Sequence, residues 1–361
     1  MSKSDRLLSL DVFRGITIVG MIIVNDPGSW EAIYMPFKHA EWNGCTPTDL
    51  VFPFFLFIVG VAISLALKNA KEDVSRHNTT LWHLLKRSGT LFLIGLFLNA
   101  FPEFHLESLR IPGVLQRIAI VFFIGSVFYL KTNWKTQVVV ASMLLLVYWA
   151  LMMLVSVPGV GIGMLEPGRN LAAFVDELLL KGHMWASTET WDPEGILSTL
   201  PAIASGLFGI LAGQWIRYKQ DKKEMLLWLF FAGNIYIVLG LLWDLSFPIN
   251  KSLWTSSYVV FTTGIALNLF AMLYWLLDIR KNRSIFWKPF EAFGTNAIFA
   301  YILSVLLQWV LGVTLQNRVY HALVAITGND YLSSLIWALL FTAIMLIPVW
   351  VLYRKRIIIK V

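Results

Sequence analysis

The chain has 361 residues, of which 57% are hydrophobic and only 14% are charged, with 16 Trp and 25 Phe. Its mean hydropathy of +0.68 is above the range of soluble domains and is typical of a protein that spans a membrane many times. The formal charge of +7 does not indicate nucleic-acid binding, because the basic residues lie in short loops beside apolar segments. The single cysteine, Cys45, excludes an internal disulfide and a cysteine-based metal cluster.

Stretches of about 20 mostly apolar residues mark the expected membrane helices. We find ten, at residues 8–25, 48–67, 88–101, 113–130, 136–156, 196–216, 225–243, 256–277, 293–314 and 333–353. The third window is short, so we expect that helix to begin nearer Leu81. The pattern predicts an all-α polytopic membrane helical bundle with about ten transmembrane helices, forming one integral membrane domain over residues 1–361.

The distribution of Lys and Arg predicts how the bundle is oriented. An even number of spans places both termini on one side of the membrane, and 22 of the 29 Lys and Arg fall on that side, among them Lys3, Arg6, Lys219 and Lys360. The other seven are Lys38, Arg110, Arg117, Arg169, Lys181, Lys251 and Arg318. Because cytoplasmic loops are enriched in Lys and Arg, we predict that both termini are cytoplasmic. The same basic loops could also hold a phosphorylated cofactor.

Polar residues stand at both ends of the first span. Asp11 and Arg14 are three residues apart and therefore share a helix face, while Asn25 ends the span. An ion pair within the helix is one interpretation of Asp11 and Arg14. Contact between Arg14 and a cytoplasmic phosphate is the other, because charge within a membrane segment is costly and usually functional.

A second polar cluster lies at the start of the second span, where His39, Trp42, Asn43 and Asp49 fall within eleven residues. Histidine is the side chain best suited to take a proton from an amine or a hydroxyl near neutral pH, and a neighbouring amide or carboxylate can fix its tautomer. The alternative is a helix-capping sequence, which suits Thr46 and Asp49. Both interpretations stay open at this point.

The loop over residues 157–195 is long, and long loops carry function more often than short ones. Within it, segment 170–181 has apolar residues at helical spacing, which predicts a short helix at the membrane surface that could cover a site. Asp192 and Glu194 come next, and we interpret them as acids in the first turn of the sixth span, where they favour the helix dipole.

Further polar residues recur near the ends of later spans. Gln116 and Arg117 lie just inside the outer end of the fourth, and an Arg at this depth should face the bundle interior. Trp254 and Ser257 begin the eighth span, and Asn296 comes early in the ninth. These groups indicate an internal passage or pocket. The sequence has no GxxxxGK[ST], GxGxxG or HExxH motif, which argues against a P-loop ATPase, a Rossmann enzyme and a zinc protease.

Several segments together resemble a known family. In chain order they are LLSLDVFRG from Leu7, KHAEWNG from Lys38, TDLVFPFFLFIVG from Thr48, RIPGVLQRIA from Arg110, WDPEGILSTLPAI from Trp191, PINKSLWTSSYV from Pro248 and FGTNAIFAY from Phe293. They are similar to the heparan-alpha-glucosaminide N-acetyltransferase family and its bacterial homologues. The resemblance implies an integral membrane acyltransferase that carries an acetyl group from cytoplasmic acetyl-CoA to a glucosamine amine across the membrane. It further implies a homodimer and, for a bacterial homologue, the inner membrane.

The resemblance also implies roles for individual residues. His39 matches the catalytic histidine of the family and Asn25 its partner, so we expect His39 to act as a general base while Asn25 stabilises the oxyanion or orients the ring. An acetyl-histidine intermediate is the alternative route. The residues expected at acetyl-CoA are Arg14, Asp11, Gln116 and Arg117. Those expected at the acceptor are Asp49, Trp42, Asn43, Trp254, Ser257 and Asn296. No metal is expected.

The acceptor and the function class leave alternatives open. We expect an amino sugar or glycan on the periplasmic side, with an amine or a hydroxyl as the acceptor group. A transporter or channel for a small anion or sugar is the rival interpretation, in which the same polar residues line a permeation path. Inverted repeats and broken helices would favour a transporter, and the sequence shows neither clearly.

Overall fold

The computed structural model describes residues 7–218 and 221–359, and almost all of the regular structure in them is helical. Within this described part, ten helices are long and apolar enough to cross a membrane, which confirms the predicted fold class. Four of the cations used to predict the orientation, Lys3, Arg6, Lys219 and Lys360, lie outside the described residues. The cytoplasmic location of both termini stays a prediction.

The described chain divides into two compact units. Unit 1 holds residues 41–44, 56–218 and 221–271, and unit 2 holds residues 7–40, 45–55 and 272–359. The divisions fall inside α2 (Val51–Ala66) and α10 (Ser256–Tyr274), so two helices contribute residues to both units. The single domain expected from the sequence stays a prediction.

Unit 1 is built around α8, whose helical neighbours pack closely on it. Besides parts of α2 and α10, the helices of unit 1 are α3 (Lys68–Glu72), η4 (Val74–Arg76), α4 (His77–Ala100), η5 (Leu106–Ser108), α5 (Val114–Lys131), α6 (Trp134–Leu154), α7 (Leu171–Leu180), α8 (Thr199–Tyr218) and α9 (Lys222–Asp244). Both α5 and α6 pack on α8. A Cβ added at Gly209 of α8 would lie 2.0 Å from the backbone oxygen of Phe57 in α2, so the small residue allows the two backbones to approach.

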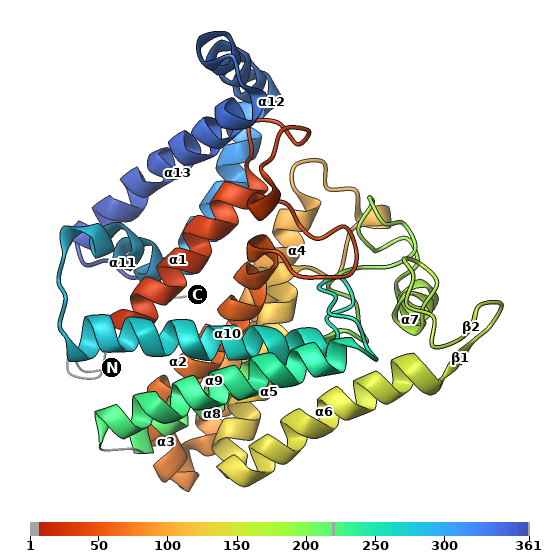
Figure 1. The fold of residues 1–361 in the computed structure, drawn as a ribbon, viewed down its shortest axis with the longest axis vertical. Helices are drawn as coiled ribbons and strands as arrows, with labels where there is room; N and C mark the ends of the chain where they lie inside the picture. Colours follow the sequence, from red (N-terminus) through yellow and green to blue (C-terminus); the bar gives the residue numbers. More distant parts are fainter. Residues whose placement is uncertain (1–6, 219–220, 360–361) are drawn as a thin grey trace. The chain divides into compact units, whose positions relative to one another are not determined.

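The loop between α6 and α8 contains regular structure. It begins with a hairpin of β1 (Ser156–Val157) and β2 (Gly161–Ile162), which the sequence did not predict (Figure 1). The predicted helix within 170–181 is confirmed as α7, and the side chain of Asn170 caps it by accepting a hydrogen bond from the backbone N–H of Ala173. Leu171 of α7 packs in an apolar cluster with Tyr148 and Phe247, which fixes the loop to unit 1.

Unit 2 pairs the first helix with elements from the end of the chain. They are α1 (Leu8–Asn25), η2 (Met35–Phe37), η3 (Pro47–Leu50), η6 (Trp275–Ile279), η7 (Ile285–Trp287), α11 (Lys288–Thr295), α12 (Ala297–Thr327) and α13 (Asp330–Arg354). The closest helix pair is α1 with α11, where a Cβ at Gly294 would lie 1.7 Å from the backbone oxygen of Asp11. Ile18, Ile22 and Phe293 begin an apolar core that continues into α13.

Two spans differ most from their predicted bounds. Helix α4 begins at His77 rather than near Leu81, and the window at 293–314 contains two helices that separate at Asn296. The amide of Asn296 donates to the Ile357 oxygen at 3.0 Å and accepts from the Ile359 nitrogen at 2.9 Å, so it holds the C-terminal segment. Because these partners are distant in sequence, the local apolar pattern could not reveal the break.

Candidate functional site

His39 and Asp49 form a close pair in unit 2. The Nδ1 atom of His39 lies 2.6 Å from Oδ1 of Asp49. The two side chains differ sharply in exposure, because 47% of the His39 side chain is exposed and only 1% of the Asp49 side chain. A half-exposed imidazole therefore contacts a buried carboxyl group.

The turn before α2 fixes Asp49. Its Oδ2 accepts hydrogen bonds from the backbone N–H groups of Ala40 and Thr46, both at 3.0 Å, and the Thr46 hydroxyl lies 3.0 Å from the same atom. Thr46 and Asp49 thereby form a capping box at η3, as the capping interpretation predicted. The same carboxyl group also contacts His39, so capping and histidine orientation are two roles of one residue.

The geometry fixes which nitrogen of the histidine can accept a proton. A carboxylate surrounded by N–H donors is stabilised in its ionised form, and the imidazole then donates its Nδ1–H to Asp49. The lone pair of the neutral ring is consequently on Nε2. When Nε2 takes a proton, the positive charge that forms is stabilised by the buried carboxylate at 2.6 Å. The pair is thus suited to general-base chemistry.

Asn25 and Asp26 end α1 in the same unit. Asn25 is exposed, and its side-chain amide makes no hydrogen bond to a residue within 7–218 or 221–359. Asp26, which the sequence analysis did not single out, is 4% exposed, and burial raises the pKa of its carboxyl group to about 7. It lines a cavity of about 10 Å³ with Gln308 and Gln316, which is room for one water molecule.

Asp11 and Arg14, predicted at the co-substrate, lie on the α1 face that meets α11. Arg14 Nη1 is 3.5 Å from Asp11 Oδ1 and donates to the Gly294 backbone oxygen at 3.1 Å. The ion pair within the helix is therefore present, as the first of the two interpretations expected. A role for either residue at acetyl-CoA stays a prediction.

Trp42 and Asn43 belong to unit 1 and attach the short segment 41–44 to two of its loops. Trp42 Nε1 donates to the Leu165 oxygen at 2.9 Å, and its ring meets Trp191 edge to face at 5.3 Å. The Asn43 side chain accepts from Asn250 Nδ2 at 3.2 Å. These contacts hold the segment that directly follows His39 in sequence, whereas acceptor binding by Trp42 and Asn43 stays a prediction.

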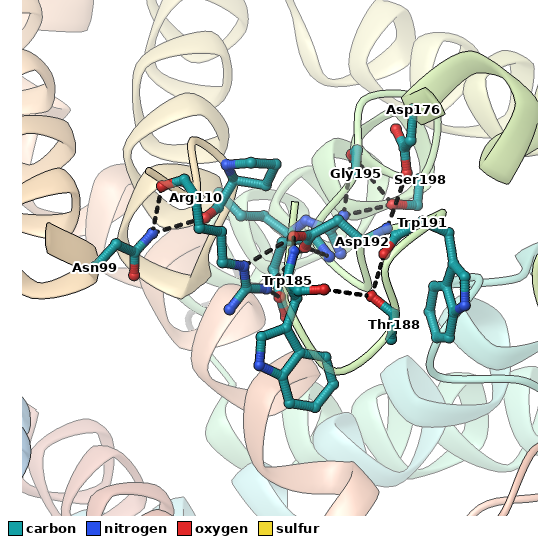
Figure 2. Close-up of polar contacts among 12 residues, drawn as sticks. Asn99, Arg110, Asp176, Trp185, Thr188, Trp191, Asp192, Gly195 and Ser198 are labelled. Carbon is teal, nitrogen blue, oxygen red and sulfur yellow. Dashed lines mark hydrogen bonds and ion pairs between the residues drawn. The ribbon is translucent and has the colours of Figure 1, made fainter. Parts of the chain in front are cut away.

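Unit 1 contains an ion-pair cluster in which Arg110 meets Asp192 and Glu194; Figure 2 shows Arg110 beside Asp192. Arg110 donates from Nε and Nη2 to the two carboxylate oxygens of Asp192, at 2.8 and 2.7 Å, and from Nη2 to Glu194 at 2.6 Å. The prediction that these acids cap the sixth span is wrong, because α8 begins only at Thr199. Their actual partner is Arg110, about eighty positions earlier in the chain.

The carboxylates also set the pKa of Arg110. Burial alone would lower this pKa, but hydrogen bonds and charge from Asp192 and Glu194 outweigh burial, and the pKa is raised. Asp176 of α7 lies on the other side of Asp192 and accepts from the backbone N–H groups of Asp192 and Ile196 at 3.2 and 2.9 Å. Burial raises its pKa to about 6, against the effect of those hydrogen bonds.

Arg117 lies inside unit 1 next to this cluster, as predicted for an Arg within a span, and is 1% exposed. Its Nη2 donates to Ser198 Oγ at 2.5 Å, and its guanidinium lies 5.1 Å from the centre of the Trp254 ring. Within the described residues, its Nε and Nη1 atoms and Nε2 of Gln116 have no hydrogen-bond partner. Ser257 is fully buried and lies 3.1 Å from Thr255 Oγ1.

The structure therefore brings together some predicted site residues and leaves others separate. It joins His39 to Asp49, Asp11 to Arg14, and Arg117 to Trp254. Asn296 uses both ends of its amide on the C-terminal segment. Sequence reasoning missed Arg110 and Asp26, whose significance lies in burial and in distant partners. Among residues 7–218 and 221–359, no group of three or more His, Cys, Asp or Glu could hold a metal ion.

Comparisons with known proteins bear on this arrangement. Residues 6–249 match the family model described as heparan-alpha-glucosaminide N-acetyltransferase, catalytic. The chain is 28% identical to heparan-alpha-glucosaminide N-acetyltransferase of Mus musculus over 427 residues, covering 100% of this chain and 61% of that protein. It is 29% identical to the Homo sapiens protein of the same name over 420 residues, covering 99% and 60%.

The chain spans about three fifths of the length of these curated relatives. The matched family region contains His39, Asp49, the Arg110 cluster and Arg117. Because that region covers more than half of the residues, the chain belongs to the heparan-alpha-glucosaminide N-acetyltransferase family.

Proposed function

We propose that this protein is a transmembrane N-acetyltransferase that moves an acetyl group from cytoplasmic acetyl-CoA to an amino sugar or glycan on the opposite face. The observation that carries the proposal is the His39–Asp49 pair, in which a half-exposed imidazole is held by a buried carboxyl group. Family membership and ten candidate spans support the class of reaction and its membrane setting.

In the proposed reaction the acceptor amine attacks the thioester carbonyl carbon while Nε2 of His39 removes a proton from the amine nitrogen. The resulting imidazolium is stabilised by Asp49 through Nδ1. The tetrahedral intermediate collapses with cleavage of the carbon–sulfur bond, and the imidazolium returns its proton to the departing CoA thiolate. The acetylated amine and CoA are the products, and His39 is neutral again.

Asn25 is proposed to assist at the oxyanion. Its amide is exposed at the end of α1 and makes no hydrogen bond to a described residue, so it can donate to a substrate oxygen. An amide that donates to the oxyanion contributes about 3 kcal/mol to the stabilisation of a transition state. The proposed co-substrate residues are Asp11, Arg14, Gln116 and Arg117. The location in a bacterial inner membrane and the homodimer belong to the same proposal.

The test is acetyl transfer from radiolabelled acetyl-CoA to a panel of amino sugars by the purified chain in detergent. We expect His39→Ala to lower kcat/KM by about 10³-fold, the middle of the range for a general base. His183→Ala is the matched control, because Nδ1 of that imidazole donates to the Leu109 backbone oxygen at 2.8 Å and its loss should affect transfer little. Transfer by His39→Ala at the wild-type rate would overturn the proposal.

An uptake assay in proteoliposomes, run beside the acetyl-transfer assay, addresses the rival class. A transporter or channel would give uptake of a small anion or sugar into proteoliposomes without any acetylated product. An enzyme gives product that requires acetyl-CoA and His39. Uptake with no acetyl transfer to any member of the panel would therefore favour the transporter and contradict the proposed function.

A further inference from the structure

Unit 1 contains a cavity that is separate from the residues discussed above. Its volume is about 870 Å³, near the upper end for small-molecule sites, and it is lined by residues of α5, α6, α8, α9 and α10 together with Lys71. Most of the lining is aliphatic or aromatic, including Phe208, Leu229 and Leu267. The cavity does not contain His39, Asp49 or any residue proposed here at acetyl-CoA.

The lining changes character along the cavity. At one end lie helix termini with interfacial residues: Trp134 near the start of α6, Tyr218 at the end of α8 and Trp228 near the start of α9. These three aromatic side chains are exposed. At the other end lie Phe208, Thr263 and Leu267, all buried in the middle of α8 and α10. Aromatic residues that are partly exposed at helix ends are typical of a membrane–water interface.

The depth of the cavity matches the thickness of the hydrocarbon region of one leaflet. Along α8 the lining runs from Phe208 to Tyr218, and ten residues at 1.5 Å per residue extend about 15 Å. This is half of the roughly 30 Å thickness of the hydrocarbon core. The cavity therefore begins at an interface and ends near the bilayer centre, the depth that one acyl chain occupies.

Two cations line the interfacial end. Arg217 is fixed because its Nη1 donates to the Ser64 backbone oxygen at 3.1 Å and to the Tyr129 hydroxyl at 3.0 Å. Its carboxylate partner is Glu72, which is exposed and 3.9 Å away. Lys71 donates to the backbone oxygens of Tyr129 and Thr132 at the end of α5. Their positive charges belong to the basic side of the bundle, which is the predicted cytoplasmic face.

We propose that this cavity binds one anionic glycerophospholipid from the leaflet on the basic side. The headgroup phosphate meets Arg217 and Lys71, and an acyl chain follows the aromatic lining toward Thr263 and Leu267. A CoA nucleotide fits less well, because its several phosphates would meet only these two cations and its polar adenosine would enter an apolar cavity. The lipid would fill the space between α6, α8 and α9 and hold these helices in place.

Native mass spectrometry of the purified full chain tests this proposal. After delipidation and incubation with phosphatidylglycerol, we expect one tightly retained lipid per chain, and phosphatidylcholine should be retained at least tenfold less. Ala232→Trp and Val138→Trp place a large ring in the lining, and Arg217→Gln removes a headgroup cation; each should reduce retention at least tenfold. Ala343→Trp on an exposed face of α13 and Lys223→Gln, an exposed cation on the same side, are matched controls and should bind as wild type does.

Thermal unfolding of each variant shows whether it is folded, and because Val138 is exposed, its substitution should be tolerated even if that of Ala232 is not. Equal retention of phosphatidylglycerol and phosphatidylcholine would overturn the assignment of an anionic headgroup. Displacement of the lipid by micromolar CoA would overturn it in favour of a nucleotide site. Wild-type retention by the folded tryptophan variants would show that the lipid binds elsewhere. None of these results depends on acetyl transfer.

Discussion

The His39–Asp49 pair of unit 2 and the Arg110–Asp192–Glu194 cluster of unit 1 each hold a nitrogen base against a buried carboxylate, yet they are suited to different tasks. Arg110 is fixed by short hydrogen bonds to two carboxylates, and its side chain is only 21% exposed. A guanidinium cannot release its proton in a protein. The His39 side chain is 47% exposed, and an imidazole can both accept and release a proton. The chemistry of the nitrogen group and its exposure together distinguish a structural ion pair from a pair suited to proton transfer.

The largest expected effect on stability comes from breaking the unit 1 cluster. Arg110→Ala leaves the carboxylates of Asp192 and Glu194 buried without their cation, which should cost about 3 to 5 kcal/mol. We expect the thermal midpoint to fall by several degrees, while acetyl transfer per folded molecule is retained. Arg169→Ala is the control, because its ion pair with Glu166 is exposed and should contribute at most about 1 kcal/mol. Similar midpoints for the two variants would contradict a structural role for the Arg110 cluster.

A second prediction concerns pH and Asp26. Burial raises its pKa from 3.8 to about 7 in the folded protein, so the folded state binds the proton more tightly than the unfolded state. Stability should therefore decrease as pH rises from about 4 to about 7 and stay level above that. Asp26→Asn lacks this ionisation, so its thermal midpoint should rise relative to that of wild type as the pH increases from about 4 to about 7.

The control for Asp26 is Glu31→Gln, an exposed carboxyl group in the same loop. Its difference from wild type should not change between pH 4 and pH 8. If Asp26→Asn and wild type differ by a constant amount over this range, Asp26 does not hold its proton as the burial implies.

The smallest effect is expected where Trp42 contacts the loop between α6 and α8. Trp42→Phe removes the hydrogen bond to Leu165 and shortens the ring that meets Trp191, at a cost of about 1 kcal/mol. Amide hydrogen exchange over residues 160–195 should increase locally, while the thermal midpoint changes little. Trp30→Phe, at an exposed position, should leave this exchange unchanged. Unchanged exchange in Trp42→Phe would show that this contact does not hold the loop.

Much of the fold could be predicted because hydropathy is a local property. The span at 8–25 matches α1, and the apolar spacing within 170–181 predicted α7. The break at Asn296, the hairpin after α6 and the true partner of Asp192 were missed, since each depends on contacts with distant residues. His39 could be found because Asp49 lies only ten residues away, whereas Asp26 could not, because sequence shows a carboxyl group but not its burial.

The central claim is that Asp49 contributes to acetyl transfer through His39, and a double-mutant cycle tests it most directly. The values of kcat for Asp49→Asn, His39→Ala and the double variant are compared with wild type, and thermal unfolding verifies that each protein is folded. We predict losses of about 10² for Asp49→Asn and about 10³ for His39→Ala, with the double variant no worse than His39→Ala alone. Losses that multiply to about 10⁵ in the double variant would show that the two residues act independently and would contradict the claim.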